Sequence, residues 1–93
     1  MKEIENKQQI LLQHLKHIQE LAVTNVMSEH KANDNIEELL YAVSFESIYR
    51  VLEWIDGYSI CSLKIDLIDK ETGQSMKNGI ELHDKCADYL RHS

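Results

Sequence analysis

The sequence predicts a single small domain, residues 1–93, of the α+β class with helices dominating. Three observations support this prediction. Apolar side chains recur at helical spacing over most of the chain, and no proline interrupts them. After Gly57 apolar and polar residues alternate, as in a strand with one buried face. The chain has the length of one domain, and 43% of it is hydrophobic, as in globular proteins.

The first predicted element is a long helix over about residues 3–27. Its apolar residues form one stripe, because successive members are spaced by three or four positions. Such a stripe is not stable in contact with water, so we expect it to pack against a partner face. The stripe consists of Leu11, Leu15, Ile18 and Ala22, and Ile4 and Gln8 extend the same line toward the N-terminus.

Two further helices are predicted over about residues 34–43 and 45–56. Asp34 and Glu37 have the spacing of a capping box, and Gly57 supplies a C-terminal stop. On a helical wheel that starts at Asp34, one apolar set clusters at roughly 140–240° and the next at roughly 300–20°. The first set is Ile36, Leu39, Leu40 and Val43, and the second is Phe45, Ile48, Leu52 and Ile55.

This change of apolar face has two physical solutions. The helix breaks or kinks near Ser44, which is a good N-cap residue. Alternatively, a continuous helix is sandwiched between two neighbours and buries different faces at its two ends. We favour the break.

A β-strand or hairpin is predicted over about residues 60–77, followed by a C-terminal helix over about residues 79–92. Residues 69–73 form the predicted turn, in which Gly73 takes the positive φ position. Asn78 is the expected N-cap of the last helix. The predicted strand has free edges, so a homodimer that shares a sheet is one arrangement it would permit. The alternating apolar residues are Cys61, Leu63, Ile65 and Leu67.

The net charge of −6 is concentrated in the middle of the chain, where residues 34–59 carry six acidic residues against Arg50, a net charge of −5. A domain of this charge lacks the cationic surface that nucleic acids and anionic membranes attract, so neither is an expected partner. The N-terminus lacks a signal-peptide core, which predicts a cytoplasmic protein. Cys61 and Cys86 are therefore expected as reduced thiols.

No pattern of residues predicts catalysis, a metal or another cofactor. His14 and His17 have a spacing compatible with metal ligation, but they share a helix line with apolar residues, so we interpret them as flanking the core. Cys86 and His83 could form a thiolate–imidazolium pair, although nothing nearby predicts an oxyanion hole. The prediction is a protein without enzymatic activity. A small metal- or thiol-dependent enzyme that uses these four residues is an alternative.

The best indication of function is the pair Arg50 and Trp54, at positions i and i+4. Both lie opposite the second apolar set on the wheel, so the indole is predicted to point away from the local core, where Arg50 could stack on it. The competing interpretation places Trp54 in the core against the N-terminal helix. Aromatic residues and arginine dominate interface hot spots. The predicted partner-binding residues are Arg50, Trp54, Tyr58, Glu46 and Glu53.

The predicted function is therefore a small acidic protein-interaction or regulatory module. Its acidic middle segment would steer a basic protein partner, because opposite charges raise association rates. A second copy of the chain is the other expected partner. The alternative function in the same class is an immunity- or antitoxin-like protein that neutralises a basic enzyme.

Overall fold

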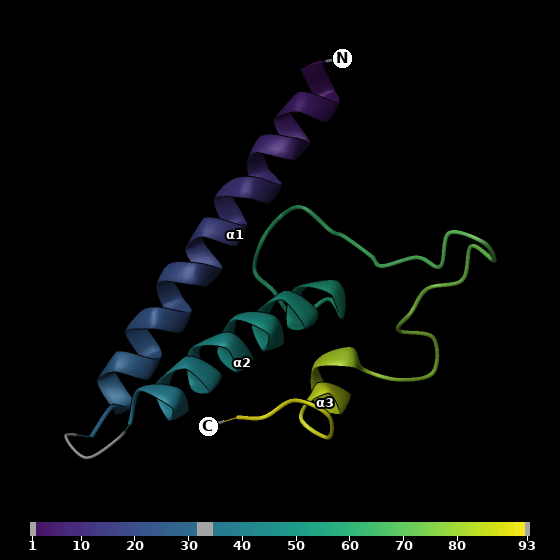
Figure 1. The fold of residues 1–93 in the computed structure, drawn as a ribbon. Coiled ribbons are helices and arrows are strands. Elements are labelled where there is room, and N and C mark those ends of the chain that lie inside the picture. Colours follow the sequence, from purple (N-terminus) through teal and green to yellow (C-terminus); the bar gives the residue numbers. More distant parts are fainter. Residues whose placement is uncertain (1, 32–34, 93) are drawn as a thin grey trace.

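The computed structural model describes residues 2–31 and 35–92. In chain order it contains α1 (Lys2–Glu29), α2 (Ile36–Ile55) and α3 (Leu82–Cys86). Figure 1 shows α2 lying beside one half of α1, with a long irregular segment leading from α2 to α3. The described residues form no β-strand, so the predicted α+β class with a hairpin is wrong, and the fold is helical.

The interface between α1 and α2 contains most of the small core. Ile18, Ala22 and Val26 of α1 are buried there, together with Trp54 of α2. The predicted apolar stripe of the first helix is thus confirmed along the C-terminal half of α1. Because Ala22 has only a methyl group, the two helices can approach closely at this position. None of the described helices is both long enough and apolar enough to cross a membrane.

The predicted break near Ser44 is wrong, because α2 is continuous from Ile36 to Ile55. The Ser44 hydroxyl donates to the carbonyl oxygen of Tyr41 within the same helix at 3.0 Å and so caps no new helix. The N-cap of α2 is Asn35, whose side chain accepts a 2.8 Å hydrogen bond from the backbone N–H of Glu38. The expected cap Asp34 lies outside the described residues.

The second solution, a sandwiched helix, is the one that the structure adopts. One side of α2 packs on α1, and another side packs on α3 and the C-terminal tail. On that second side, the ring of Phe45 stacks on His92 with centroids 4.1 Å apart, and Tyr49 meets His83 edge-on at 5.4 Å. The apolar residues of α2 therefore lie on two sides because the helix has two neighbours, whereas Ile36 and Leu40 near its N-terminus stay 74% and 65% exposed.

The predicted stop at Gly57 is confirmed. Gly57 has a φ of 92°, a left-handed conformation that glycine adopts without steric cost. Its N–H donates to the carbonyl of Trp54 at 3.1 Å, and the N–H of Tyr58 donates to Glu53 at 2.9 Å. This pair of hydrogen bonds is the Schellman motif, which satisfies the last carbonyl groups of α2.

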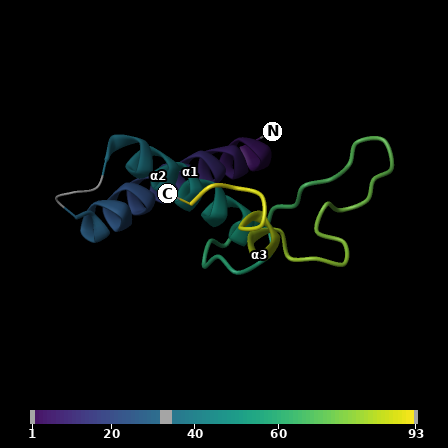
Figure 2. The ribbon, with the colours of Figure 1, turned by 60° about the horizontal axis from the view of Figure 1, so that its bottom comes forward.

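The segment predicted as a hairpin is irregular and extends away from the helices in both views (Figures 1 and 2). The predicted turn does form, because Gly73 has a φ of 76° and its N–H donates to Asp69 at 2.8 Å. Beyond the turn, the pairing is a single antiparallel bridge between Ile68 and Ser75. Two strands without a third strand are marginally stable, which explains why the alternating pattern does not produce a sheet.

The C-terminal helix is much shorter than predicted, spanning Leu82–Cys86 rather than residues 79–92. Gly79 has a φ of 78°, which prevents a helix from beginning at the expected cap, Asn78. Glu81 occupies the N-cap position of α3, but its side chain accepts no hydrogen bond from the helix. The capping acceptor is instead the side chain of Asp56, at the end of α2.

Candidate functional site

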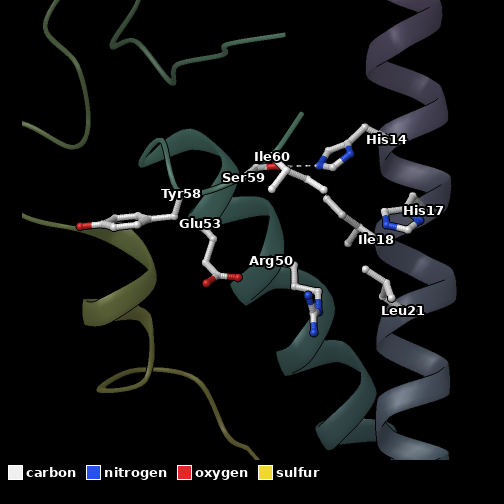
Figure 3. A pocket seen from close by; sticks show the side chains of 9 residues that line it. All are labelled: His14, His17, Ile18, Leu21, Arg50, Glu53, Tyr58, Ser59 and Ile60. Atoms are coloured by element: carbon white, nitrogen blue, oxygen red, sulfur yellow. Dashed lines mark hydrogen bonds between the residues drawn. The ribbon is translucent and has the colours of Figure 1, made fainter. Parts of the chain in front are cut away.

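The site with the most varied chemistry is a cleft between α1 and the C-terminal part of α2, closed at one end by the chain that follows α2 (Figure 3). It encloses about 310 Å³ and combines two imidazoles, a guanidinium, a carboxylate and a hydroxyl with apolar side chains. The lining residues are His14, His17, Ile18, Leu21, Arg50, Glu53, Tyr58, Ser59 and Ile60.

His14 links α1 to the segment that closes the cleft. Its Nε2 lies 3.1 Å from the hydroxyl oxygen of Ser59 (Figure 3). That hydroxyl also accepts the backbone N–H of Cys61 at 3.1 Å, so its own hydrogen is available for the imidazole. On another side, the His14 ring meets the indole of Trp54 edge-on, with centroids 4.4 Å apart.

The surroundings of His14 favour a neutral imidazole. Burial lowers the pKa of His14, and the neighbouring His17 lowers it further, since two imidazolium charges on one helix face repel. A neutral ring that accepts from Ser59 through Nε2 carries its hydrogen on Nδ1. Imidazole and hydroxyl are two members of a catalytic triad, but no described carboxylate is hydrogen-bonded to His14 to orient it.

Trp54 lies behind the cleft rather than on its surface, and the predicted outward orientation is wrong. Its side chain is only 2% exposed, and its Nε1–H donates to the carbonyl oxygen of Leu63 at 2.9 Å. The indole does lie opposite the α3-facing side of α2, as the wheel predicted. That side is covered by α1, which the competing interpretation of Trp54 as a core residue had anticipated.

Arg50 faces the cleft but does not stack on the indole. Its Nε donates to Glu46 at 2.8 Å, one helical turn away, with both side chains 27% exposed. Glu46 also accepts from the side-chain amide of Asn25 on α1 at 3.4 Å. The Arg50 charge is therefore neutralised inside the molecule, and the three side chains form a polar link between α1 and α2.

Glu53 is the cleft residue whose charge is not neutralised. Its side chain is half-buried, and among the described residues it forms no hydrogen bond and no ion pair. The surrounding wall is partly apolar, since Ile18 is buried beneath the cleft and Ile60, at its mouth, is 99% exposed. A half-buried carboxylate can accept hydrogen bonds from an N–H donor, neutral or cationic, that enters the cleft.

Tyr58 contributes its ring to the cleft wall while its hydroxyl points toward α3 (Figure 3). The hydroxyl donates to the carboxylate of Glu81, a hydrogen bond that raises the pKa of the Tyr58 phenol. The structure thus brings three of the five predicted partner-binding residues to one cleft: Arg50, Glu53 and Tyr58. Glu46 adjoins the cleft, whereas Trp54 lies behind it.

Sequence reasoning missed the contribution of α1 and of Ser59 and Ile60 to this site. The spacing of His14 and His17 was a usable signal, although it had been interpreted as flanking the core. Ser59 and Ile60 carry no local pattern, and the Schellman motif that ends α2 directs them toward α1.

A second polar cluster joins α3 to the end of α2. One carboxylate oxygen of Asp56 accepts from the backbone N–H of His83 at 2.8 Å and lies 2.6 Å from its ring Nδ1. Burial alone would raise the pKa of Asp56, but the hydrogen bonds from His83 and Leu82 outweigh it and lower the pKa. Asp56 thereby acts as the N-cap of a helix 27 positions further along the chain.

This cluster does not form the thiolate–imidazolium pair of the enzyme alternative. The thiol of Cys86 donates to the backbone carbonyl of His83 at 3.2 Å, while the His83 ring is held by Asp56. Burial raises the pKa of Cys86, and the nearby carboxylates Asp56 and Asp84 raise it further. The thiol is therefore protonated at neutral pH. Within residues 2–31 and 35–92, no three His, Cys, Asp or Glu side chains are grouped to hold a metal ion.

Comparison of the chain with protein-family models, with curated proteins and with solved structures found no significant match.

Proposed function

We propose that this protein is a non-enzymatic interaction module whose α1–α2 cleft binds a basic, partly apolar segment of a protein partner. The observation that carries the proposal is the half-buried carboxylate of Glu53, which forms no ion pair with the described residues. Because this carboxylate has lost part of its contact with water and has no ionic partner among the described residues, a cation from outside the chain would stabilise it.

The remaining walls favour a peptide segment over a simple cation. Leu21 and the strongly exposed Ile60 line the same cleft and offer apolar contact to a ligand. The ring of Tyr58 adds a rigid aromatic surface of the kind found in interface hot spots. A Lys or Arg side chain buries its methylene groups against such surfaces while its charged end reaches a carboxylate.

The charge of the whole chain supports the same partner. Residues 34–59 carry a net charge of −5. Arg50 is the one basic residue of this segment, and its charge is neutralised by the ion pair with Glu46. The field around the cleft therefore attracts basic segments and raises their association rate. Since exposed charges are screened by salt, this rate should fall as ionic strength increases.

The test uses two synthetic amphipathic peptides, one of leucine and lysine and one of leucine and glutamate. We expect the Leu/Lys peptide to bind and to shift the backbone NMR signals of His17, Glu53 and Ile60, while the Leu/Glu peptide does not bind. The variant Glu53→Gln should weaken binding of the Leu/Lys peptide about tenfold, the effect of a charge-assisted hydrogen bond of about 1.4 kcal/mol.

The matched control is Glu38→Gln, which removes the same charge at the exposed, opposite end of α2. This variant should bind the Leu/Lys peptide within about twofold of the unmodified protein, because the affected charge is remote from the cleft and screened. Equal weakening by both variants would show that binding follows net charge alone. In that case the proposed role of the cleft is wrong.

A further inference from the structure

The apolar stripe of α1 is covered along only one half of the helix. In the C-terminal half, Ile18, Ala22 and Val26 are 5%, 0% and 9% exposed. On the same side of the N-terminal half, Ile4 is 49% exposed and Leu15 is 36% exposed. Leu11, between these two residues, is half-buried, so the face is buried at its C-terminal end, partly covered in its middle and about half open to water at Ile4.

The difference follows from the lengths of the two helices. At about 1.5 Å per residue, the 28 residues of α1 span about 42 Å and the 20 residues of α2 span about 30 Å. Figure 1 shows that the first turns of α1 extend beyond α2 and beyond the rest of the chain, whereas the segment after α2 reaches α1 near His14. Nothing among the described residues covers the part of the stripe around Ile4.

The chain as a whole exposes more surface than a compact monomer of its mass. Its accessible surface is 7154 Å², against about 5,600 Å² for a compact protein of 10.9 kDa. Its radius of gyration is 15.3 Å, against about 12 Å for a compact domain of this length. This excess is shared between the N-terminal part of α1 and the segment after α2, which also extends away from the helices.

The charge of this part of α1 suits a second copy of the same chain. Residues 2–15 contain two lysines and two glutamates, so the region has no net charge. Lys7 and Glu3 already form an ion pair within the helix at 3.8 Å. Two chains of net charge −6 repel each other over most of their surfaces, and a neutral apolar stripe allows them to meet without that repulsion.

We propose that the open half of the α1 stripe packs antiparallel against the same half of α1 in a second copy, forming a homodimer. An antiparallel pair related by a two-fold axis places equivalent surfaces in contact, which closes the assembly at two chains. The register that matches the open positions sets Ile4 of one protomer beside Leu15 of its partner. Gln8 then lies beside Leu11 of the other protomer. This proposal does not depend on what the cleft binds.

The first test is sedimentation equilibrium of the full chain over a range of concentrations. We expect a mass of twice 10.9 kDa at high concentration, with dissociation on dilution. The variants Ile4→Glu and Leu15→Glu should shift the dissociation constant at least a hundredfold and leave a monomer at the same concentrations. Circular dichroism that matches the unmodified protein shows that both variants retain their helices.

The matched control is Ile36→Glu, which makes the same change at a residue that is 74% exposed at the start of α2, away from the N-terminal half of α1. It should remain dimeric. An unmodified protein that is monomeric at millimolar concentration would overturn the proposal. So would a dimer that Ile36→Glu disrupts and Leu15→Glu does not, since another face would then form the contact.

A cross-linking experiment tests the antiparallel register independently of affinity. In a background of Cys61→Ser and Cys86→Ala, the double variant Ile4→Cys with Leu15→Cys should form a covalent dimer on mild oxidation. Each single cysteine variant should not, because a two-fold antiparallel pair keeps like positions 4 and 4, or 15 and 15, apart. Efficient cross-linking of Ile4→Cys alone would indicate parallel helices and contradict the proposed arrangement.

Discussion

The indole Nε1–H of Trp54 donates a 2.9 Å hydrogen bond to the carbonyl oxygen of Leu63, nine positions further along the chain. This contact attaches the irregular segment after α2 to the helical hairpin. Since the described part of that segment contains no strand, side-chain contacts of this kind hold it in place. The same indole supports the ring of His14, so one buried side chain positions two walls of the cleft.

The substitution Trp54→Phe should destabilise the protein by about 1 kcal/mol, because the carbonyl of Leu63 loses its donor while an aromatic ring still fills the core. Trp54→Ala should cost about 3–5 kcal/mol, because it also leaves a cavity. Urea denaturation followed by circular dichroism measures both values. Tyr58→Phe, which removes an exposed hydrogen bond, should stay within about 0.5 kcal/mol. A Trp54→Ala variant as stable as the unmodified protein would refute the assignment of Trp54 to the core.

Asp56 should determine how the free energy of unfolding decreases at acid pH. Its pKa is lowered in the folded state by the hydrogen bonds from His83 and Leu82. The stabilisation is therefore complete above the unfolded-state pKa of about 3.9 and is lost as pH falls through the lower, folded-state pKa. Asp56→Asn should flatten this loss and cost about 1–3 kcal/mol at neutral pH, since the N–H groups of His83 lose a charged acceptor.

The control for this experiment is Asp88→Asn, which removes an exposed carboxylate of the same kind. Its unfolding free energy should follow the unmodified protein across the acid range. If Asp56→Asn and Asp88→Asn gave identical curves, the capping of α3 by Asp56 would have no energetic role.

His14 should change the stability of the fold at higher pH values than Asp56 does. Burial and the neighbouring His17 lower the pKa of His14 in the folded state, so the unfolded chain binds this proton more readily. Stability should therefore fall as pH drops below about 6.5 and should level off below the folded-state pKa. His14→Gln removes this dependence and keeps a group that can bond to Ser59. Thermal melting at pH values between 5 and 8 is the measurement, and a dependence that persists in His14→Gln would assign it to another residue.

Much of the helical hairpin could be predicted from local patterns. The stripe of α1, the stop at Gly57 and the turn at Gly73 all rest on interactions within a few residues. The cleft could be predicted only in part, because Arg50 and Glu53 follow one another on a single helix face, whereas Ser59 and His14 are 45 positions apart. The orientation of Trp54 was predicted wrongly because the wheel identifies opposite sides of a helix but does not show how many of them are covered.

The sequence by itself determined which residues are helical in α1 and α2 and where α2 ends, since backbone preference and apolar spacing act over a few residues. It also determined the concentration of negative charge between residues 34 and 59. Tertiary structure decided the rest. It decided that α2 stays continuous between two neighbours, that Trp54 is buried, and that residues 60–68 form no strand. Each of these outcomes depends on a partner surface that is distant in the sequence. Burying an apolar face stabilises the fold only when that partner surface is present to cover it.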